Sequence, residues 1–82
     1  MRRRGVFDIS ASLLEVLEIG HCNKTTLGNR ANLPTRSLKR YMDLLLRFNL
    51  ATQDEFTDSF KVTDKGRNFL EQYMKLKKFI EK

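Results

Sequence analysis

Apolar and charged residues separate onto two faces over residues 33–50, the most regular stretch of the chain. At about 100° per residue, one face of a predicted helix gathers large apolar side chains, namely Leu38, Tyr41, Met42, Leu45 and Phe48. The opposite face gathers mostly basic residues, namely Arg36, Lys39, Arg40, Asp43 and Arg47. Pro34 or Thr35 begins this helix, since proline is tolerated in a first turn, and Asn49 suits a left-handed C-cap. The pattern predicts a helix with one face in a small core and cations on the other.

Another amphipathic helix is predicted earlier in the chain, from Val6 to Ile19. Its core stripe has helical spacing and consists of Ile9, Leu13, Val16 and Leu17, widened by Phe7, Leu14 and Ile19. We expect Asp8 or Ser10 to cap this helix, because short polar side chains accept hydrogen bonds from first-turn amides. Gly20 ends it.

A short helix is predicted between these two, ending near Ala31. Thr25 or Thr26 would cap it, and Leu27 and Ala31 give it a small apolar face. Proline at position 34 disfavours the α conformation at Leu33, so the helix stops there and Leu33 should enter the core.

The period changes after residue 50, where the chain looks extended. In the segment Ser59 to Thr63, Phe60 and Val62 fall on the same side of a strand. The intervening QDEFTD is polar but contains no glycine, which disfavours a tight two-residue turn. The sequence predicts a two-stranded hairpin with a loop of about four to six residues.

A last helix is predicted from Thr63, which would cap it, towards the chain end. Four apolar residues spaced four, three and four apart form a narrow coiled-coil seam, namely Phe69, Tyr73, Leu76 and Ile80. Leu70 and Met74 lie to one side and are expected to pack on the domain, and Glu71 and Lys75 form an i,i+4 pair. The seam either pairs with the same helix of a second chain or folds back onto the first helix.

Composition narrows the function classes. The 82 residues suffice for one domain, and 16 Lys+Arg against 10 Asp+Glu give a net charge of +6. This excess points to a polyanionic partner. A single cysteine, Cys22, excludes an intramolecular disulfide, and with the single His21 it cannot complete a four-ligand zinc site. We expect no metal, cofactor or small-molecule ligand, no signal peptide or membrane span, and a cytoplasmic protein.

The order of elements (helix, short helix, longer helix, hairpin, helix) is that of a winged helix-turn-helix. The segments RRRGVFDISASLLEVLE, NKTTLGNRANL, LKRYMDLLL and VTDKGRNFLEQY occur in the corresponding order. In these segments the chain resembles small archaeal winged-helix proteins regarded as transcriptional regulators, some of which are abundant DNA-binding proteins that dimerise through a C-terminal helix.

The resemblance implies a mainly α fold with a small β-hairpin and an extended C-terminal helix. It implies one domain over residues 1–82, with a basic arm at 1–5, a core at 6–62 and a dimerisation helix at 63–82. A homodimeric, nucleoid-associated DNA-binding protein follows, with Phe69, Tyr73, Leu76 and Ile80 at the dimer interface.

In such a fold the third helix enters the major groove. The DNA-contacting residues by position are Thr35, Arg36, Ser37, Lys39 and Arg40, and Arg36 and Arg40 can each bind guanine or phosphate through a forked guanidinium. Lys24 and Arg30 are candidates for phosphate contacts. The residues Arg2, Arg3 and Arg4 either form an arm along a groove or only solubilise the chain.

Two acidic features argue against the interpretation as a DNA-binding protein. Asp43 lies within the basic stripe. We expect its carboxylate to pair with Lys39 or Arg47 rather than to accept a hydrogen bond from a cytosine amino group. The hairpin carries Asp54, Glu55 and Asp58, which repel phosphate. These acids keep open an alternative, a protein-interaction winged helix with Phe56 as an exposed contact. No catalytic motif is present, so we expect no enzyme.

Overall fold

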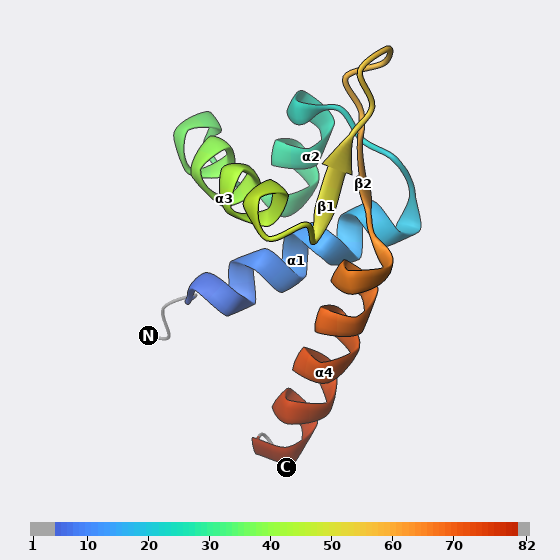
Figure 1. Ribbon diagram of the computed structural model, residues 1–82. Helices are drawn as coiled ribbons and strands as arrows, with labels where there is room; N and C mark the ends of the chain where they lie inside the picture. The colour runs from blue at the N-terminus through green and yellow to red at the C-terminus, as the bar shows by residue number, and fades with distance from the viewer. Residues whose placement is uncertain (1–4, 81–82) are drawn as a thin grey trace.

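The computed structural model describes residues 5–80, which form four helices and one two-stranded sheet (Figure 1). The elements in chain order are α1 (Val6–Ile19), α2 (Lys24–Ala31), α3 (Thr35–Arg47), β1 (Ala51–Gln53), β2 (Phe60–Val62) and α4 (Asp64–Ile80). Helix α1 runs beneath α2, α3 and the hairpin, and α4 leaves the hairpin to extend away from them. The predicted fold class, mainly α with a small β-hairpin and an extended C-terminal helix, is confirmed.

The core lies where α1 meets the other elements. Leu13, Leu14 and Leu17 of α1 are buried at its centre. The other elements bury apolar side chains against them, namely Leu27 and Ala31 of α2, Leu38, Met42 and Leu45 of α3, Ala51, Phe60 and Val62 of the strands, and Leu70 of α4. Leu33 packs half-buried at the margin. The stripes that helical spacing predicts therefore form one continuous core.

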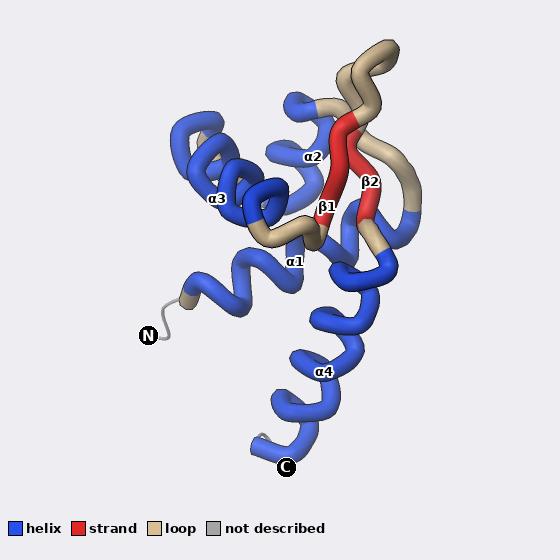
Figure 2. The backbone as a smooth tube through the Cα atoms, viewed as in Figure 1, coloured by secondary structure: helices blue, strands red, loops and turns tan. Residues whose placement is uncertain are grey.

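The hairpin pairs its strands antiparallel, with Ala51 opposite Val62 and Gln53 opposite Phe60. Residues 54–59 form the loop, within the predicted length, and Figure 2 shows this loop extending beyond the strands. Phe60 also exchanges backbone hydrogen bonds with Cys22, donating to its carbonyl at 2.8 Å and accepting from its amide at 3.3 Å. This bridge adds a third extended segment beside the hairpin. The segment is a single residue long, which is too short to show the alternation that predicts a strand.

The predicted caps of the first two helices are correct only for Asp8, which takes part in the capping of α1 from within the helix rather than as its N-cap. Gly5 precedes α1, and Asp8 is the third residue of the helix, where its carboxylate accepts from the Gly5 amide at 3.2 Å. Ser10 is buried within α1. Asn23, rather than Thr25 or Thr26, caps α2 by accepting from the Thr26 amide at 2.8 Å. Helix α1 begins at Val6 as predicted, with Gly5 at the N-cap position, whereas α2 begins at Lys24, earlier than the predicted caps allow, so Asn23 takes the capping role.

Other helix ends follow the predictions. Gly20 ends α1, and Asn49 adopts the left-handed conformation, with φ 60°, just after α3. Thr63 Oγ1 accepts from the Gly66 amide at 2.9 Å and donates to the Asn49 carbonyl at 2.6 Å. The hydroxyl of Thr63 thus caps α4 and ties its start to the end of α3.

Three apolar residues predicted to belong to core stripes lie at the surface. Phe7 and Ile19 lie in the first and last turns of α1 and are 68% and 82% exposed, although the Phe7 ring contacts that of Phe69 in α4. Phe48 is 52% exposed, because α3 has ended at Arg47 and the chain there turns towards β1. Spacing alone places these residues on the core-facing side of their helices but does not show where the neighbouring elements stop covering that side.

Candidate nucleic-acid interface

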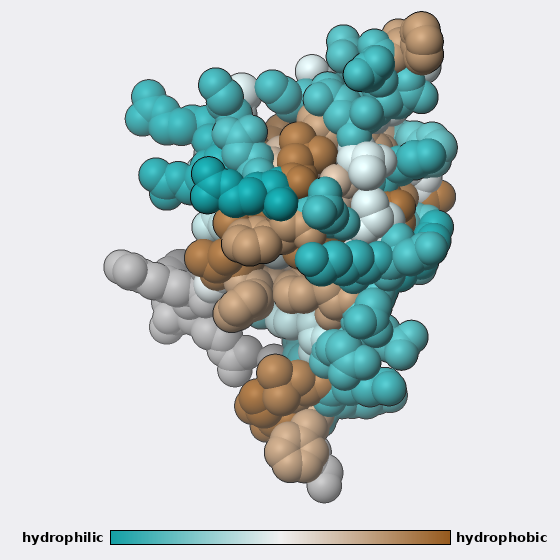
Figure 3. Space-filling model, viewed as in Figure 1, coloured by the Kyte–Doolittle hydropathy of each residue, from teal (hydrophilic) through white to brown (hydrophobic). Residues whose placement is uncertain are grey.

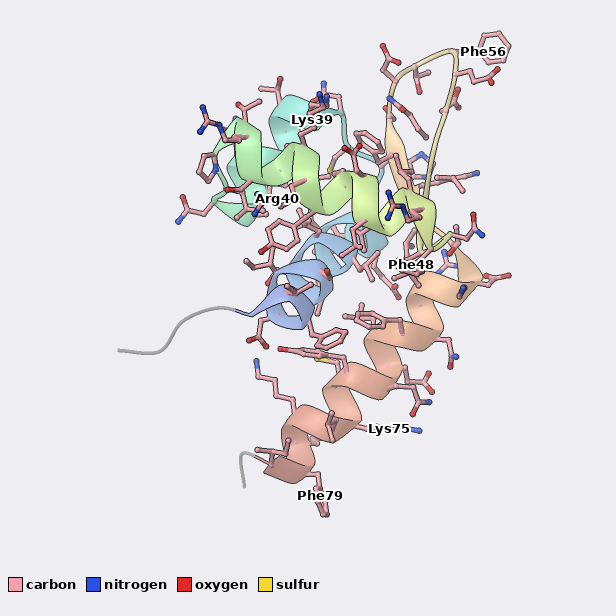
Figure 4. All side chains as sticks on the ribbon, turned by 60° about the vertical axis from the view of Figure 1, so that its left-hand side comes forward. Lys39, Arg40, Phe48, Phe56, Lys75 and Phe79 are labelled. Atoms are coloured by element: carbon pink, nitrogen blue, oxygen red, sulfur yellow. The ribbon has the colours of Figure 1, made fainter. Side chains whose placement is uncertain are left out.

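The charged face of α3 is open to solvent, as the spacing predicts. Its side chains surround a shallow hollow of about 380 Å³, hereafter the α3 hollow, which is lined by Arg36, Lys39, Arg40, Asp43, Leu44 and Arg47. All of these are exposed except Leu44, which is half-buried. Hydrophilic side chains cover the α3 region in Figure 3, and Figure 4 shows Lys39 and Arg40 extending from α3 into solvent.

Core packing fixes the orientation of this face. Leu38, Met42 and Leu45 are at most 2% exposed and hold the opposite side of α3 against the body. Arg36 and Arg40 are one helical turn apart and both exposed, so their guanidinium groups leave the same side of the helix. The packed face thus presents the cations on a rigid support, which favours binding of an extended polyanion.

Asp43 does not pair as predicted. Among residues 5–80, the ion pairs within 4.0 Å join Arg67 to Glu18 and Asp64, and Lys75 to the predicted partner Glu71, and none includes Asp43. In this structure the extended side chains of Lys39 and Arg47 do not bend to the Asp43 carboxylate. Exposed pairs of this kind contribute at most about 1 kcal/mol, which often fails to offset the side-chain entropy that pairing costs.

The start of α3 adds backbone donors to the surface. Pro34 is the N-cap and has no side chain that accepts a hydrogen bond, so the first-turn amides have no side-chain cap. Thr35 is exposed there and Ser37 is half-buried. Free amides and hydroxyls at a helix N-terminus are suited to a phosphate oxygen.

The other predicted contact residues are less concentrated. Arg30 is exposed in the last turn of α2 and is separated by three residues from Pro34, the N-cap of α3. Lys24 is exposed at the opposite end of α2. The structure thus brings Arg30 towards the start of α3 and leaves Lys24 a helix length away. The residues Arg2, Arg3 and Arg4 lie outside the described part of the chain.

The tip of the hairpin, residues 54–59, differs in charge from α3 and is hereafter the wing tip. Its three acidic side chains are exposed, and Phe56 between them is 96% exposed. The Asp54 carboxylate accepts from the amides of Phe56 and Thr57 at 2.8 and 3.4 Å, which shapes the turn. The tip is an ordered acidic loop with an aromatic residue at its end.

The predicted seam of α4 divides into two halves. Phe69 and Tyr73 are half-buried against the core, where the Phe69 ring lies 6.2 Å from that of Phe7 and the Tyr73 hydroxyl donates to the Asp8 carboxylate. Leu76 and Ile80 are 57% and 70% exposed. The first half of the seam thus folds onto α1, and the second half extends into solvent.

Two further apolar residues are exposed near the end of α4. Met74 is 45% exposed rather than packed on the domain as predicted, and it lines an open groove on α4 together with Leu70. Phe79, which the seam spacing does not include, is 78% exposed. Residues 74–80, hereafter the α4 end, form the projecting end of the helix in Figure 4. Apolar side chains gather at the bottom of Figure 3, beside hydrophilic ones.

Comparisons with known proteins agree with this architecture. A search of curated proteins finds no significant match. Among solved structures, the adhesin competence repressor AdcR from Streptococcus pyogenes is similar with a TM-score of 0.69, at 13% identity over 89% of this chain. An O-methyltransferase, NcsB1, from neocarzinostatin biosynthesis is similar with a TM-score of 0.64, at 19% identity over 78% of this chain.

These structural similarities extend to the fold alone, since the chain spans 58% of the repressor and 21% of the methyltransferase. No helix within residues 5–80 is long and apolar enough to cross a membrane. A family model described as winged helix-turn-helix matches residues 3–81, nearly the whole chain. The chain therefore belongs to the winged helix-turn-helix family.

Proposed function

We propose that this protein is a DNA-binding regulator or chromatin-associated protein that contacts duplex DNA with α3 and acts as a homodimer. The observation that carries the proposal is the exposed face of α3. Four basic side chains, those of Arg36, Lys39, Arg40 and Arg47, project from one side of a helix whose other side is buried. None of the four forms an ion pair within residues 5–80. The repressor among the similar structures adds support at the level of fold.

Each group on this surface has a role in the proposal. Arg36 and Arg40 reach into the major groove, where a forked guanidinium binds guanine O6 and N7 or a phosphate. Lys39, Thr35 and Ser37 bind backbone phosphates, as do the open amides at the start of α3. Lys24 and Arg30 of α2, with Arg2, Arg3 and Arg4 before α1, extend the phosphate contacts along the duplex. No catalytic step is proposed.

The proposed dimer forms through the α4 end. Burying a large apolar side chain stabilises an interface by roughly 1.5 to 3 kcal/mol, and Leu76 and Ile80 are largely exposed in one chain. Antiparallel pairing of two α4 helices, which the resemblance to dimeric winged-helix proteins implies, would let Leu76 and Ile80 of one chain cover those of the other. Such a pair would present two α3 surfaces to one duplex.

The test of DNA binding is fluorescence anisotropy of a labelled random duplex of roughly 20 bp, titrated at several salt concentrations. We expect log Kd to rise with log salt with a slope of several units, because each neutralised phosphate contributes about 0.9. A folded protein that leaves the anisotropy unchanged at low salt would contradict the proposal.

A second candidate, a protein-interaction module, is favoured by one observation. The three exposed carboxylates of the wing tip oppose approach of the hairpin to phosphate. This candidate predicts weak DNA binding that substitutions in α3 leave unchanged. Comparing the salt slopes of the native chain and an α3 variant therefore decides between the two functions.

A further inference from the structure

Phe56 is the most exposed large apolar residue in the described chain, at 96%. The wing tip keeps it there, since the Asp54 amide donates to the Ser59 carbonyl at 2.8 Å and the Asp58 amide to the Asp54 carbonyl at 2.9 Å. Figure 4 shows Phe56 pointing away from the rest of the molecule. An aromatic ring held in water by an ordered loop is typical of a contact residue for another molecule.

The surface that complements this tip lies on the same chain. The wing tip carries three exposed acids, Asp54, Glu55 and Asp58, together with the exposed Phe56. The α3 hollow has the opposite charge, since four cations, one acid and the half-buried Leu44 line it. Each surface thus combines an apolar residue with charges that are opposite in sign to those of the other, and charge complementarity of this kind selects partners.

We propose that the wing tip of one molecule binds the α3 hollow of a second copy. Phe56 then covers Leu44, and the wing carboxylates lie among Arg36, Lys39 and Arg40. The contact must form between molecules, because Phe56 points away from the body that carries α3. This inference rests on the proposed function, since it assigns the anion-binding surface of α3 a second anionic ligand.

The consequence is competition with DNA. A phosphate backbone and the acidic wing tip need the same cations, so a molecule whose α3 hollow holds a wing tip cannot bind a duplex through that helix. The contact is mainly electrostatic and exposed, so it weakens as salt shortens the Debye length. The acidic hairpin, which disfavours a conventional DNA complex, thereby limits DNA binding by occupying the α3 hollow of another free molecule.

The test uses two complementary variants of the full chain, so that only one contact can form. The ¹⁵N-labelled partner carries Glu55→Gln and Phe56→Ala and keeps an intact α3 hollow. The unlabelled titrant carries Arg40→Glu and keeps an intact wing tip. All three side chains are exposed, so both variants are expected to fold. At about 20 mM salt we expect amide shifts across α3 of the labelled chain, lost at about 300 mM salt.

A control titrant carries all three substitutions and so lacks both surfaces. Any pairing through α4 perturbs the labelled chain equally with either titrant, whereas only the titrant with an intact wing tip should shift α3. Shifts in α3 that are absent, or equal with both titrants, overturn the inference. If the Glu55→Gln/Phe56→Ala chain still binds DNA but no wing-dependent shifts appear, only this inference is contradicted. If wing-dependent shifts appear but the chain binds no duplex, only the proposed function is contradicted.

Discussion

Helices α3 and α4 both have one packed face, but what they leave in solvent differs. Outside the core contact, α3 exposes Arg36, Lys39, Arg40 and Arg47, which water solvates well. The α4 end exposes Leu76, Phe79 and Ile80 at 57%, 78% and 70%, which water solvates poorly. The two helices therefore indicate different partners, a polyanion for α3 and an apolar surface for α4.

The difference arises from where each helix meets α1. Helix α3 packs along the body, so its apolar stripe is covered from Leu38 to Leu45. Helix α4 packs on α1 only through its first half, which includes Phe69 and Tyr73, and then projects from the domain. The regularly spaced apolar stripe of α4 is thus covered in its first half and exposed in its second. Only the covered half contributes to the fold of a single chain.

The largest expected effect concerns the start of α4. A Cβ at Gly66 would overlap the Leu50 carbonyl oxygen, a backbone atom that cannot move aside easily. We expect Gly66→Ala to lower the free energy of unfolding by about 3 kcal/mol, measured by urea denaturation. Gly20→Ala is the matched control, because its Cβ meets no atom within 4 Å. Equal denaturation midpoints for the two variants would show that α4 is not anchored closely at Gly66.

The next effect separates the cations of α3 from those of α4. We expect Arg36→Ala/Arg40→Ala to weaken duplex binding at least about tenfold and to lower the salt slope by about 2, since each lost phosphate contact removes about 0.9. Lys75→Ala/Lys78→Ala removes the same charge from α4 and should change anisotropy titrations little. Similar losses in both variants would mean that net charge, rather than the α3 surface, carries binding.

A third effect tests the apolar end of α4. Leu76→Asp should shift the protein from dimer to monomer in equilibrium sedimentation at micromolar concentration, because a buried unpaired carboxylate disfavours the interface. Ile19→Asp is the matched control, since Ile19 is also largely exposed, at 82% against 57% for Leu76, but lies on α1, outside the seam. A chain that is monomeric before either substitution would refute pairing through α4.

The smallest effect concerns the one acid in the α3 hollow. Asp43 has no ion pair within residues 5–80, so its carboxylate only repels phosphate. Asp43→Asn should strengthen duplex binding by up to about fivefold, equivalent to the 0.2–1 kcal/mol of an exposed charge interaction. A weaker complex would instead show that Asp43 accepts a hydrogen bond from a base, which anisotropy with cytosine-free sites would then confirm.

Much of the fold was predictable because it depends on local pattern. The amphipathic period placed α1 and α3, the alternation of Phe60 and Val62 placed β2, and the hydroxyl of Thr63 marked the start of α4. These signals reside in a few neighbouring residues and need no knowledge of the partner element. The charged face of α3 followed from the same period.

The remaining features depend on tertiary contacts. The bridge between Cys22 and Phe60 joins one residue to a distant strand, and no local pattern specifies it. The exposure of Ile19 and Phe48, at helix ends, and of Met74, beside an open groove, depends on how neighbouring elements pack, which spacing does not encode. For the same reason the seam of α4 looked uniform in sequence although the structure divides it. The DNA-contact and dimer residues stay predictions, since their partners are other molecules.

The most direct test of the central claim is an ¹⁵N NMR titration of the full chain with a duplex of roughly 20 bp at low salt. We predict that amide shifts concentrate in α3 and in the residues that lead into it from α2, and that the α4 end changes little. Shifts in the wing tip are expected only from its release from the α3 hollow of a second copy when the duplex binds there. Shifts confined to the wing tip or the α4 end, with α3 unchanged at saturating duplex, would contradict the claim that α3 is the DNA-binding surface.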